Sequence, residues 1–363
     1  MLHIVNVCFV GKFGLADYTL SLARALSRFG RSEIVTSQDF DYPEVPFEGT
    51  VTKLFRRSRN YPVDVLRFLF YVLRSRPDIL IFQSVLKLPV VDGLIVRVIR
   101  AFGIRVFATV HDVLPHHPKP WSKAEYLFFY KGFDGLVAHS DIARNQLCDY
   151  GVRVPVTVIP HGVYDIYKLN LIGRQSARES LGFCSDDFVA LFFGRIDPRK
   201  GVEFLVELVE SGRLPTGVKL LFAGMDGLSS FDESLRKRFE MAAKSDKCVA
   251  IVREIAFSEV ERVFEAADVV LLPYKEGTTS GVLKLAIAFD RPVVASGIGD
   301  IPANVRPGTG IVYGMADPVS SIADALSLIR ENYASYAEAC RESSEELGWG
   351  NVGKSYFEFV SKV

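Results

Sequence analysis

The segment FGRIDPRKGV, from Phe193 to Val202, holds two cations where an apolar run ends and a helical pattern begins. Arg195 supplies a planar guanidinium with several donors, and Lys200 supplies a compact ammonium. Unpaired N–H groups at the start of the following helix add a positive field at the same place. The segment therefore predicts a binding site for a diphosphate, with two solvated surface cations as the alternative.

A second loop, YKEGTTSG, occupies the same kind of position after the apolar run VVLLP. Glu276 can accept hydrogen bonds from sugar hydroxyls. Backbone N–H groups further along can wrap a phosphate, and a plain loop is the alternative interpretation. The residues concerned are Gly277, Thr278, Thr279, Ser280 and Gly281.

The first half of the chain offers two weaker candidates. Gly14 ends the loop Gly11-Lys-Phe-Gly, where it either lets a phosphate approach the backbone or merely makes the turn. His111 ends the apolar run that leads into Thr109-Val-His-Asp112, and a histidine at such an edge can contact a sugar or a leaving group. Asp112 is predicted to orient this imidazole or to cap a helix.

The remaining histidines predict no catalytic or metal site. His111, His116 and His117 lack i, i+4 spacing and a partner cysteine, so no metal is assigned. His139 and His161 also fall at strand ends, where structural hydrogen bonds are favoured over catalysis.

Several function classes are excluded by missing motifs. The sequence has no G-x-S-x-G elbow, which excludes that hydrolase design. The first glycine loop is not G-x-G-x-x-G, and no fitting acidic residue ends the second strand, so a nicotinamide cofactor is not expected.

The elements that must position these residues alternate between short apolar runs and helical patterns. This repetition predicts an α/β protein made of two Rossmann-like, doubly wound parallel sheets that face each other across a cleft. The expected domains are residues 1–165, residues 166–345 and a last helix within 346–363 that crosses back to the first domain. Residues 161–182 are expected to be a linker, and 40–59 and 114–123 to be loops that recognise an acceptor.

The order of the motifs resembles glycosyltransferase family 4 of the GT-B enzymes. The first half carries GLADYTLSLARAL from Gly14, TVHD from Thr109 and VIPHGV from Val158. The second half carries GRIDPRKG from Gly194, Ala223-Gly224, Glu276-Gly277, PVVASGIGDIP from Pro292 and TGIV from Thr309. Together these motifs cover nearly the whole chain.

The resemblance implies a retaining, metal-independent transfer of a sugar from a UDP- or GDP-linked donor, with no cofactor. Arg195 and Lys200 match the pair that stabilises the leaving diphosphate, and Glu276 matches the first glutamate of the Glu-x7-Glu motif, which contacts the donor sugar. His111 matches the position near the acceptor, and Gly14 matches the loop that closes over the diphosphate. The implied donor-binding residues are Gly14, Gly194, Arg195, Lys200, Glu276, Gly277, Thr278, Thr279, Ser280, Gly281 and Lys284.

Lys284 departs from the family pattern, because the second glutamate of the motif should stand there. In the family that carboxylate accepts hydrogen bonds from the ribose, whereas an ammonium only donates. Either the ribose is held differently, or the donor is unusual, or Lys284 adds positive charge for a phosphate or an acidic sugar. Lys284 keeps a non-catalytic GT-B-like scaffold open as an alternative function. A GT-B sugar-nucleotide epimerase, with the same fold and different chemistry, is another alternative.

Charge and cysteine content concern the cellular setting. The 43 basic and 43 acidic residues cancel, which argues against a nucleic-acid binder, yet residues 1–165 carry a net +5 and the remainder a net −5. Five scattered cysteines and an amino terminus without signal-peptide features favour the cytoplasm.

The segment Lys53–Arg76 combines basic and apolar residues. It predicts contact with an anionic membrane surface, and a core helix with solvated arginines is the alternative. The expected function is thus transfer to a polysaccharide or glycolipid acceptor at the inner membrane face.

Overall fold

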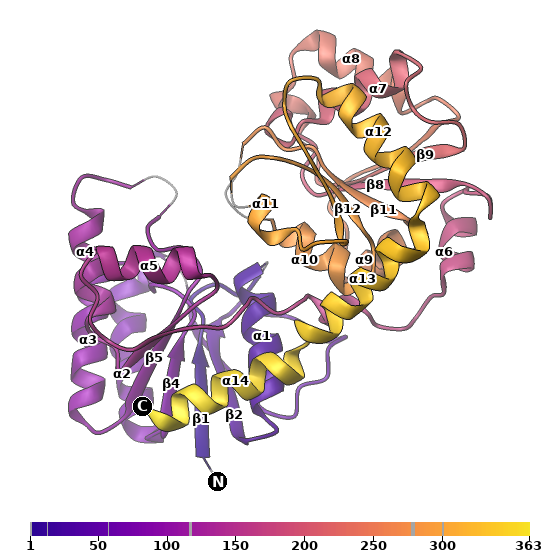
Figure 1. Ribbon diagram of the computed structural model, residues 1–363. Coiled ribbons are helices and arrows are strands. Elements are labelled where there is room, and N and C mark those ends of the chain that lie inside the picture. The colour runs from indigo at the N-terminus through magenta and orange to yellow at the C-terminus, as the bar shows by residue number, and fades with distance from the viewer. Residues whose placement is uncertain (1, 13, 57, 116–117, 277–279, 300) are drawn as a thin grey trace. The chain divides into compact units, whose positions relative to one another are not determined.

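The computed structural model describes residues 2–363 apart from 13, 57, 116–117, 277–279 and 300. The chain divides into two compact units (Figure 1). Unit 1 comprises Met1–Gly162 together with Leu347–Val363, and unit 2 comprises Val163–Glu346. The carboxyl-terminal segment therefore belongs to the unit that contains the amino terminus.

The described residues of unit 1 form a seven-stranded parallel sheet of order β3-β2-β1-β4-β5-β6-β7. Its strands are β1 (Leu2–Val7), β2 (Gly30–Ser37), β3 (Thr50–Phe55), β4 (Ile79–Phe82), β5 (Arg105–Val110), β6 (Gly135–Ala138) and β7 (Val156–Val158). Its helices are α1 (Gly14–Leu26), α2 (Tyr61–Ser75), α3 (Pro89–Ala101), α4 (Ser122–Tyr130), α5 (Asp141–Asp149) and α14 (Trp349–Lys362), with a 3-10 turn, η1 (Ser58–Asn60).

Both faces of this sheet are covered, because successive side chains of each strand point to opposite faces. Val5 and Val7 pack in one core with residues of α2, α3, α4 and α5. Ile4 packs in the other core with residues of α1 and α14. In Figure 1 α14, drawn in yellow, runs beside α1, and the two helices are in contact.

The described residues of unit 2 form a six-stranded parallel sheet of order β10-β9-β8-β11-β12-β13. Its strands are β8 (Phe188–Phe193), β9 (Val218–Gly224), β10 (Cys248–Val252), β11 (Val269–Leu272), β12 (Val293–Ser296) and β13 (Gly310–Tyr313). Its helices are α6 (Arg174–Ser180), α7 (Val202–Glu210), α8 (Glu233–Ala242), α9 (Phe257–Ala266), α10 (Gly281–Ala288), α11 (Ile301–Asn304), α12 (Pro318–Glu331) and α13 (Tyr333–Glu346), with 3-10 turns η2 (Asp165–Tyr167), η3 (Pro198–Lys200) and η4 (Leu228–Ser230).

The parallel α/β architecture of both units confirms the predicted fold class. Two expectations about connecting segments are wrong. Residues 40–59 contain β3, whose first four residues are not fully buried, so this edge strand lacks the apolar run of a central strand. The expected linker contains α6, which packs on α9.

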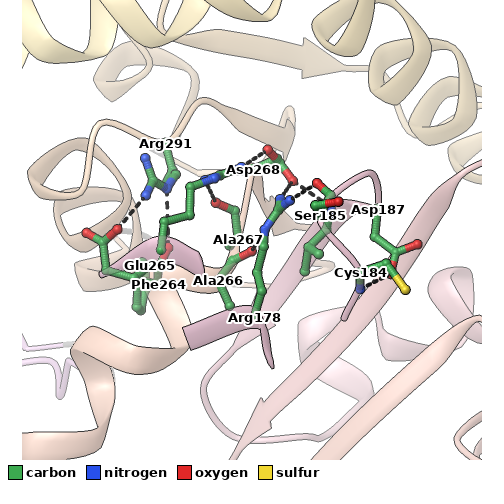
Figure 2. Close-up of polar contacts among 12 residues, drawn as sticks. Arg178, Cys184, Ser185, Asp187, Phe264, Glu265, Ala266, Ala267, Asp268 and Arg291 are labelled. Carbon is green, nitrogen blue, oxygen red and sulfur yellow. Dashed lines mark hydrogen bonds and ion pairs between the residues drawn. The ribbon is translucent and has the colours of Figure 1, made fainter. Parts of the chain in front are cut away.

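A buried ion-pair network fastens α6 to the amino end of β11 (Figure 2). Asp268 pairs with both Arg174 and Arg178, and it accepts a hydrogen bond of 2.7 Å from the Val189 backbone N–H. The Arg178 guanidinium also donates to the carbonyls of Ser185 and Ala266, at 2.8 and 3.2 Å. Because the charges are paired and hydrogen-bonded, their burial is tolerated.

No helix among the described residues is long and apolar enough to cross a membrane. The five cysteines are free thiols, of which Cys8, Cys248 and Cys340 are buried. Burial raises the pKa of Cys8 to about 11 and that of Cys340 to about 12, so these two thiols stay protonated at neutral pH.

Candidate functional site

Two glycines bring the loops after β8 and β9 into close backbone contact. Gly194 donates its N–H to the Ala223 carbonyl at 3.0 Å and has φ +117°. A Cβ on Gly224 would lie 1.9 Å from the Gly194 carbonyl oxygen. The exit of β8 therefore needs glycine at both positions.

Asp197 organises the turn that carries the two predicted cations. Its buried carboxylate caps η3 by accepting the Lys200 N–H at 3.2 Å. The same carboxylate lies 3.7 Å from Arg195 Nε and 3.2 Å from an Arg199 guanidinium nitrogen. Nearly half of the Arg195 side chain is exposed, so its remaining donors can reach a ligand.

Lys200 lies against an aromatic ring. Its Nζ stands 3.5 Å from the centroid of the Tyr274 ring, a cation–π contact. Burial lowers the pKa of Lys200 to about 8, with Arg199 acting in the same direction and Asp197 opposing. A bound diphosphate would favour the charged form, because opposite charge stabilises an ammonium.

The loop after β11 is joined to the loop after β8. The N–H groups of Lys275 and Glu276 both donate to the Arg199 carbonyl, at 2.9 and 3.3 Å. Gly201, with φ +68°, faces the same junction, since a Cβ there would lie 1.8 Å from the Pro273 carbonyl oxygen. The Glu276 side chain is exposed. Arg195, Lys200 and Glu276 thus come to neighbouring loops at the carboxyl edge of one sheet.

The remaining predicted residues of this loop lead into α10. Ser280 precedes the helix, with its hydroxyl 3.3 Å from that of Tyr274, and the exposed Gly281 begins it. Gly277, Thr278 and Thr279 lie outside the described residues. The Tyr274 carbonyl accepts a hydrogen bond of 2.6 Å from Ser296, which ties the loop to β12.

Lys284 lies in the first turn of α10. Its Nζ is 3.3 Å from Asn304 Oδ1. Burial, and then the neighbouring Arg306, lower the pKa of Lys284 to about 8. An ammonium therefore stands where the family pattern expects a carboxylate, and it adds positive charge to the edge that carries Lys200.

The predicted residues of unit 1 are Gly14 and His111. Gly14 is exposed at the first position of α1. His111 follows β5, with Nε2 3.5 Å from the Gln83 amide oxygen. Burial and the neighbouring His139 hold the pKa of His111 well below its usual value. The imidazole is therefore neutral at physiological pH and can both donate and accept hydrogen bonds.

Three histidines surround one tyrosine beside this imidazole. The Tyr18 ring lies 4.7, 5.3 and 4.8 Å from the rings of His111, His139 and His161. His139 Nδ1 is 2.9 Å from the Ile159 carbonyl oxygen. His161 Nδ1 is 2.6 Å from the Gly162 carbonyl oxygen, so both histidines make the structural contacts that were expected.

Helix α14 completes this cluster. The Tyr356 hydroxyl is 2.7 Å from that of Tyr18 and 3.1 Å from that of Thr109, and all three residues are buried. Thr109 stands two residues before His111, so the side chains of both point to the same face of the sheet. The Tyr356 hydroxyl thus links α1 to the end of β5.

Sequence reasoning missed Asp197, Tyr274, Tyr18 and Tyr356. Asp197 carried a readable signal, because an aspartate three residues before Lys200 fits a cap. The ring of Tyr274 and the pairing of Tyr18 with Tyr356, 338 residues apart, carried none.

Within the described ranges, no group of three or more histidine, cysteine, aspartate or glutamate residues has a metal-binding arrangement. His116 and His117 lie outside those ranges.

Two protein-family models match this chain. The model described as Glycosyltransferase Family 4 matches residues 14–165, and the model described as Glycosyl transferases group 1 matches residues 187–332. Together the two matches span most of the chain, one over each half.

Curated proteins with similar sequences include two D-inositol 3-phosphate glycosyltransferases. The protein of Actinosynnema mirum is 30% identical over 216 residues, which are 54% of this chain and 49% of that protein. The protein of Mycobacterium marinum is 28% identical over 228 residues, which are 60% of this chain and 48% of that protein. The chain thus spans about half the length of the curated relatives it matches.

Solved structures match over the whole chain. Sucrose-phosphate synthase from Thermosynechococcus elongatus aligns with a TM-score of 0.70 and 20% identity, covering 100% of this chain and 99% of that one. HepE of Anabaena, in complex with UDP, aligns with a TM-score of 0.72 and 16% identity, covering 100% of both chains. At such identities the likeness establishes the fold.

Proposed function

This chain belongs to the group 1 and family 4 glycosyltransferases and has their GT-B fold, and we propose that it transfers a sugar from a nucleotide-diphosphate sugar with retention of configuration. The acceptor is a saccharide or a lipid-linked saccharide at the cytoplasmic face of a membrane. The reaction needs neither a metal ion nor a cofactor. The observation that carries the proposal is the loop after β8, where Asp197 holds Arg195 and Lys200 at the carboxyl edge of the sheet.

Arg195 and Lys200 bind the diphosphate of the donor in this mechanism. The bond between the anomeric carbon and the phosphate oxygen breaks, and negative charge develops on the leaving diphosphate. A guanidinium and an ammonium already in place stabilise that charge without reorganisation. HepE of Anabaena has been solved with UDP and with UDP-glucose, which supports a donor of this chemical class.

The acceptor hydroxyl forms the new bond on the face that the diphosphate leaves, and its proton passes to a phosphate oxygen. Glu276 accepts hydrogen bonds from hydroxyls of the donor sugar, since its side chain is exposed while its backbone N–H fixes the loop to the Arg199 carbonyl. In unit 1, the neutral His111 is a hydrogen-bonding group for substrate hydroxyls.

The test is a panel of labelled UDP- and GDP-sugars, incubated with the full chain and with membranes as a source of acceptor. We expect transfer, or slow hydrolysis, of one donor. Replacing Arg195 or Lys200 by alanine should lower kcat by about 100-fold or more, as when a preorganised donor to a developing negative charge is removed. Arg199→Ala is the matched control, because it removes a neighbouring, more exposed guanidinium.

Other outcomes would overturn the proposal. Inversion at the sugar C2 without transfer would indicate an epimerase, and failure to bind any sugar nucleotide would indicate a scaffold. Equal turnover by Arg195→Ala, Lys200→Ala and Arg199→Ala would remove the leaving-group role of the pair.

A further inference from the structure

Helices α2 and α3 expose a row of apolar side chains on the side away from their sheet. On α2 these are Val63, Leu66 and Phe70, and along α3 they are Val91, Leu94, Val98 and Phe102. Leu66, Phe70 and Phe102 are each more than 60% exposed. We call these seven residues the α2–α3 apolar face.

The spacing of these residues shows that each helix exposes one continuous apolar stripe. Positions 63, 66 and 70 lie one turn apart, as do 91, 94, 98 and 102, so each set follows one stripe of its helix. The opposite stripes, with Val65, Phe68 and Val72 on α2, are buried in the core. The two helices are in contact and cover the same face of the sheet, so their outer stripes are neighbours.

Basic residues surround this face, and few carboxylates lie near it. Residues 53–105 contain eleven lysines and arginines but three aspartates. Asp64 and Asp92 are buried, and the exposed Asp78 accepts the His3 backbone N–H at 2.7 Å. The exposed cations that flank the helices include Arg59, Arg74, Arg76 and Lys87, whereas the guanidinium of Arg100 is paired with Asp134.

Asp64 shows how the negative charge is masked. Its carboxylate lies 2.9 Å from Arg56 Nη2 and 3.6 Å from Arg67 Nη1. One buried aspartate is thus shared by two arginines, and the surface at α2 stays positive. A solvent-facing helix ordinarily carries charges of both signs.

We propose that the α2–α3 apolar face docks unit 1 on the surface of an anionic lipid bilayer. The apolar side chains enter the boundary between headgroups and acyl chains, and the flanking arginines and lysines pair with lipid phosphates. The long stems of arginine and lysine allow the helices to sink while the charges stay at the headgroups. The sequence indicated the segment Lys53–Arg76, and the structure adds α3 to that surface.

A second copy of the chain fits this face less well. Two copies meeting face to face through a twofold axis would place the same basic residues opposite one another, and like charges repel. An anionic bilayer instead offers negative charge over the whole area of the face. Charge complementarity therefore selects the lipid surface.

The inference rests on the proposed transfer to a membrane-associated acceptor, but its test reads binding alone. The full chain is floated with vesicles of phosphatidylcholine, with and without phosphatidylglycerol. We expect binding to the anionic vesicles that weakens as salt is added, because screening reduces the contribution of the arginines. Loss of transfer with retained binding would count against the proposed function only.

Two sets of variants test the two parts of the surface. Leu66→Ser, Phe70→Ser and Leu94→Ser together should lower the vesicle partition coefficient by about tenfold or more, since apolar area no longer enters the bilayer. Arg59→Gln with Arg74→Gln should lower it by about fivefold for each charge removed.

Matched controls carry the same substitutions elsewhere on the surface. Ile142→Ser, Met241→Ser and Leu328→Ser remove exposed apolar side chains of α5, α8 and α12. Arg236→Gln and Lys244→Gln remove two exposed charges of unit 2. All controls should bind vesicles like the unmodified chain.

Three results would overturn the proposal. The first is no binding of the unmodified chain to anionic vesicles. The second is equal loss in the α2–α3 variants and their controls. The third is a dimer in solution that the triple serine variant converts to a monomer, which would assign the face to a second copy of the chain.

Discussion

Lys200 is a candidate anion-binding cation whose side chain is nevertheless partly buried. Its ammonium is placed for anion binding, next to Arg195 in the loop after β8. It also lies over the Tyr274 ring, where burial lowers its pKa to about 8. Burial disfavours the charged form of Lys200, and a nearby diphosphate favours it. We therefore expect the diphosphate to stabilise the ammonium of Lys200 more than that of a fully solvated lysine.

A pH dependence of nucleotide binding follows. The free enzyme loses the Lys200 charge as pH rises through about 8, so we expect UDP affinity to fall between pH 7.5 and 9.5, by up to about tenfold for each pH unit above that pKa. Isothermal titration across this range measures it. Lys200→Arg should bind UDP with little pH dependence, because a guanidinium stays charged.

Lys284 provides the control, since its pKa is also lowered to about 8. A Lys284→Gln variant that keeps the full pH dependence assigns it to Lys200, whereas a flat profile in that variant would contradict the assignment. The stability effect has the opposite sign. A lysine whose folded-state pKa is depressed destabilises the fold most below pH 8, and this cost is relieved as pH rises toward 10.5.

The hydroxyl of Tyr356 joins two other elements of unit 1, because it lies within hydrogen-bond distance of Tyr18 on α1 and Thr109 on β5. Tyr356→Phe keeps the buried ring but removes the bridge between Tyr18 and Thr109. We expect a loss of about 1–3 kcal/mol in the free energy of unfolding, because buried hydroxyls lose a partner. Hydrogen exchange of the α1 and β5 amides measures this loss.

The comparison variant is Tyr150→Phe. Its hydroxyl accepts a hydrogen bond from the Gln146 side chain at the end of α5, where it is only partly buried. This change should cost little, because water replaces the lost contact. Equal effects of the two substitutions would contradict the role given to the Tyr356 hydroxyl.

At the scale of elements, the carboxyl and amino ends of the strands in unit 2 have different roles. The carboxyl ends of β8 and β11 carry the candidate ligand-binding loops. The amino end of β11 carries the Asp268 network, which attaches α6 and binds no part of the proposed site (Figure 2). Stability and activity can therefore be tested separately.

Asp268→Ala should destabilise unit 2 by about 3–5 kcal/mol, because it leaves the buried Arg178 guanidinium without its counter-charge. Loss of hydrogen-exchange protection at β8 and β11 measures the effect. Glu338→Ala is the control: it breaks an ion pair with Arg341 that is open to solvent on both sides, so it should have little effect on stability. Similar losses in both variants would show that the network is not what holds α6.

At the scale of the whole molecule, the division into units sharpens the charge asymmetry. Unit 1, with its carboxyl-terminal segment, contains 22 basic and 15 acidic residues, a net +7. Unit 2 contains 21 basic and 28 acidic residues, a net −7. Residues 1–165 alone carry +5; the segment 347–363 adds one net positive charge to unit 1, and the second comes from Asp165, which belongs to unit 2.

Removal of residues 347–363 should damage unit 1 selectively. Trp349, Val352, Tyr356 and Val360 all lie in the core beneath α1, and their loss exposes Tyr18 and Leu22. We expect hydrogen-exchange protection to collapse in α1 and β1 while β8 and β9 keep theirs. Equal loss in both units, or none in α1, would contradict this prediction. A fragment ending at residue 165 would suffer the same damage.

Local sequence was enough to predict the alternation of strands and helices, because near-continuous apolar runs of strand length mark strands covered on both faces. It also placed Arg195, Lys200, Glu276 and His111 after strands, where a parallel sheet presents its loops. The sequence pattern did not predict the edge strand β3 or helix α6, because exposed or charged residues interrupt their apolar patterns.

Only the tertiary structure decided which residues surround these groups. The ring beneath Lys200, the link from Tyr356 to Thr109 and the adjacency of α2 to α3 join positions that local sequence does not relate. Propensity and periodicity act over a few residues, whereas these contacts arise when whole elements pack. The sequence by itself therefore determined which functional groups this protein has. Packing determined the protonation state of Lys200, the contacts that hold the end of β5, and the apolar surface that α2 and α3 expose.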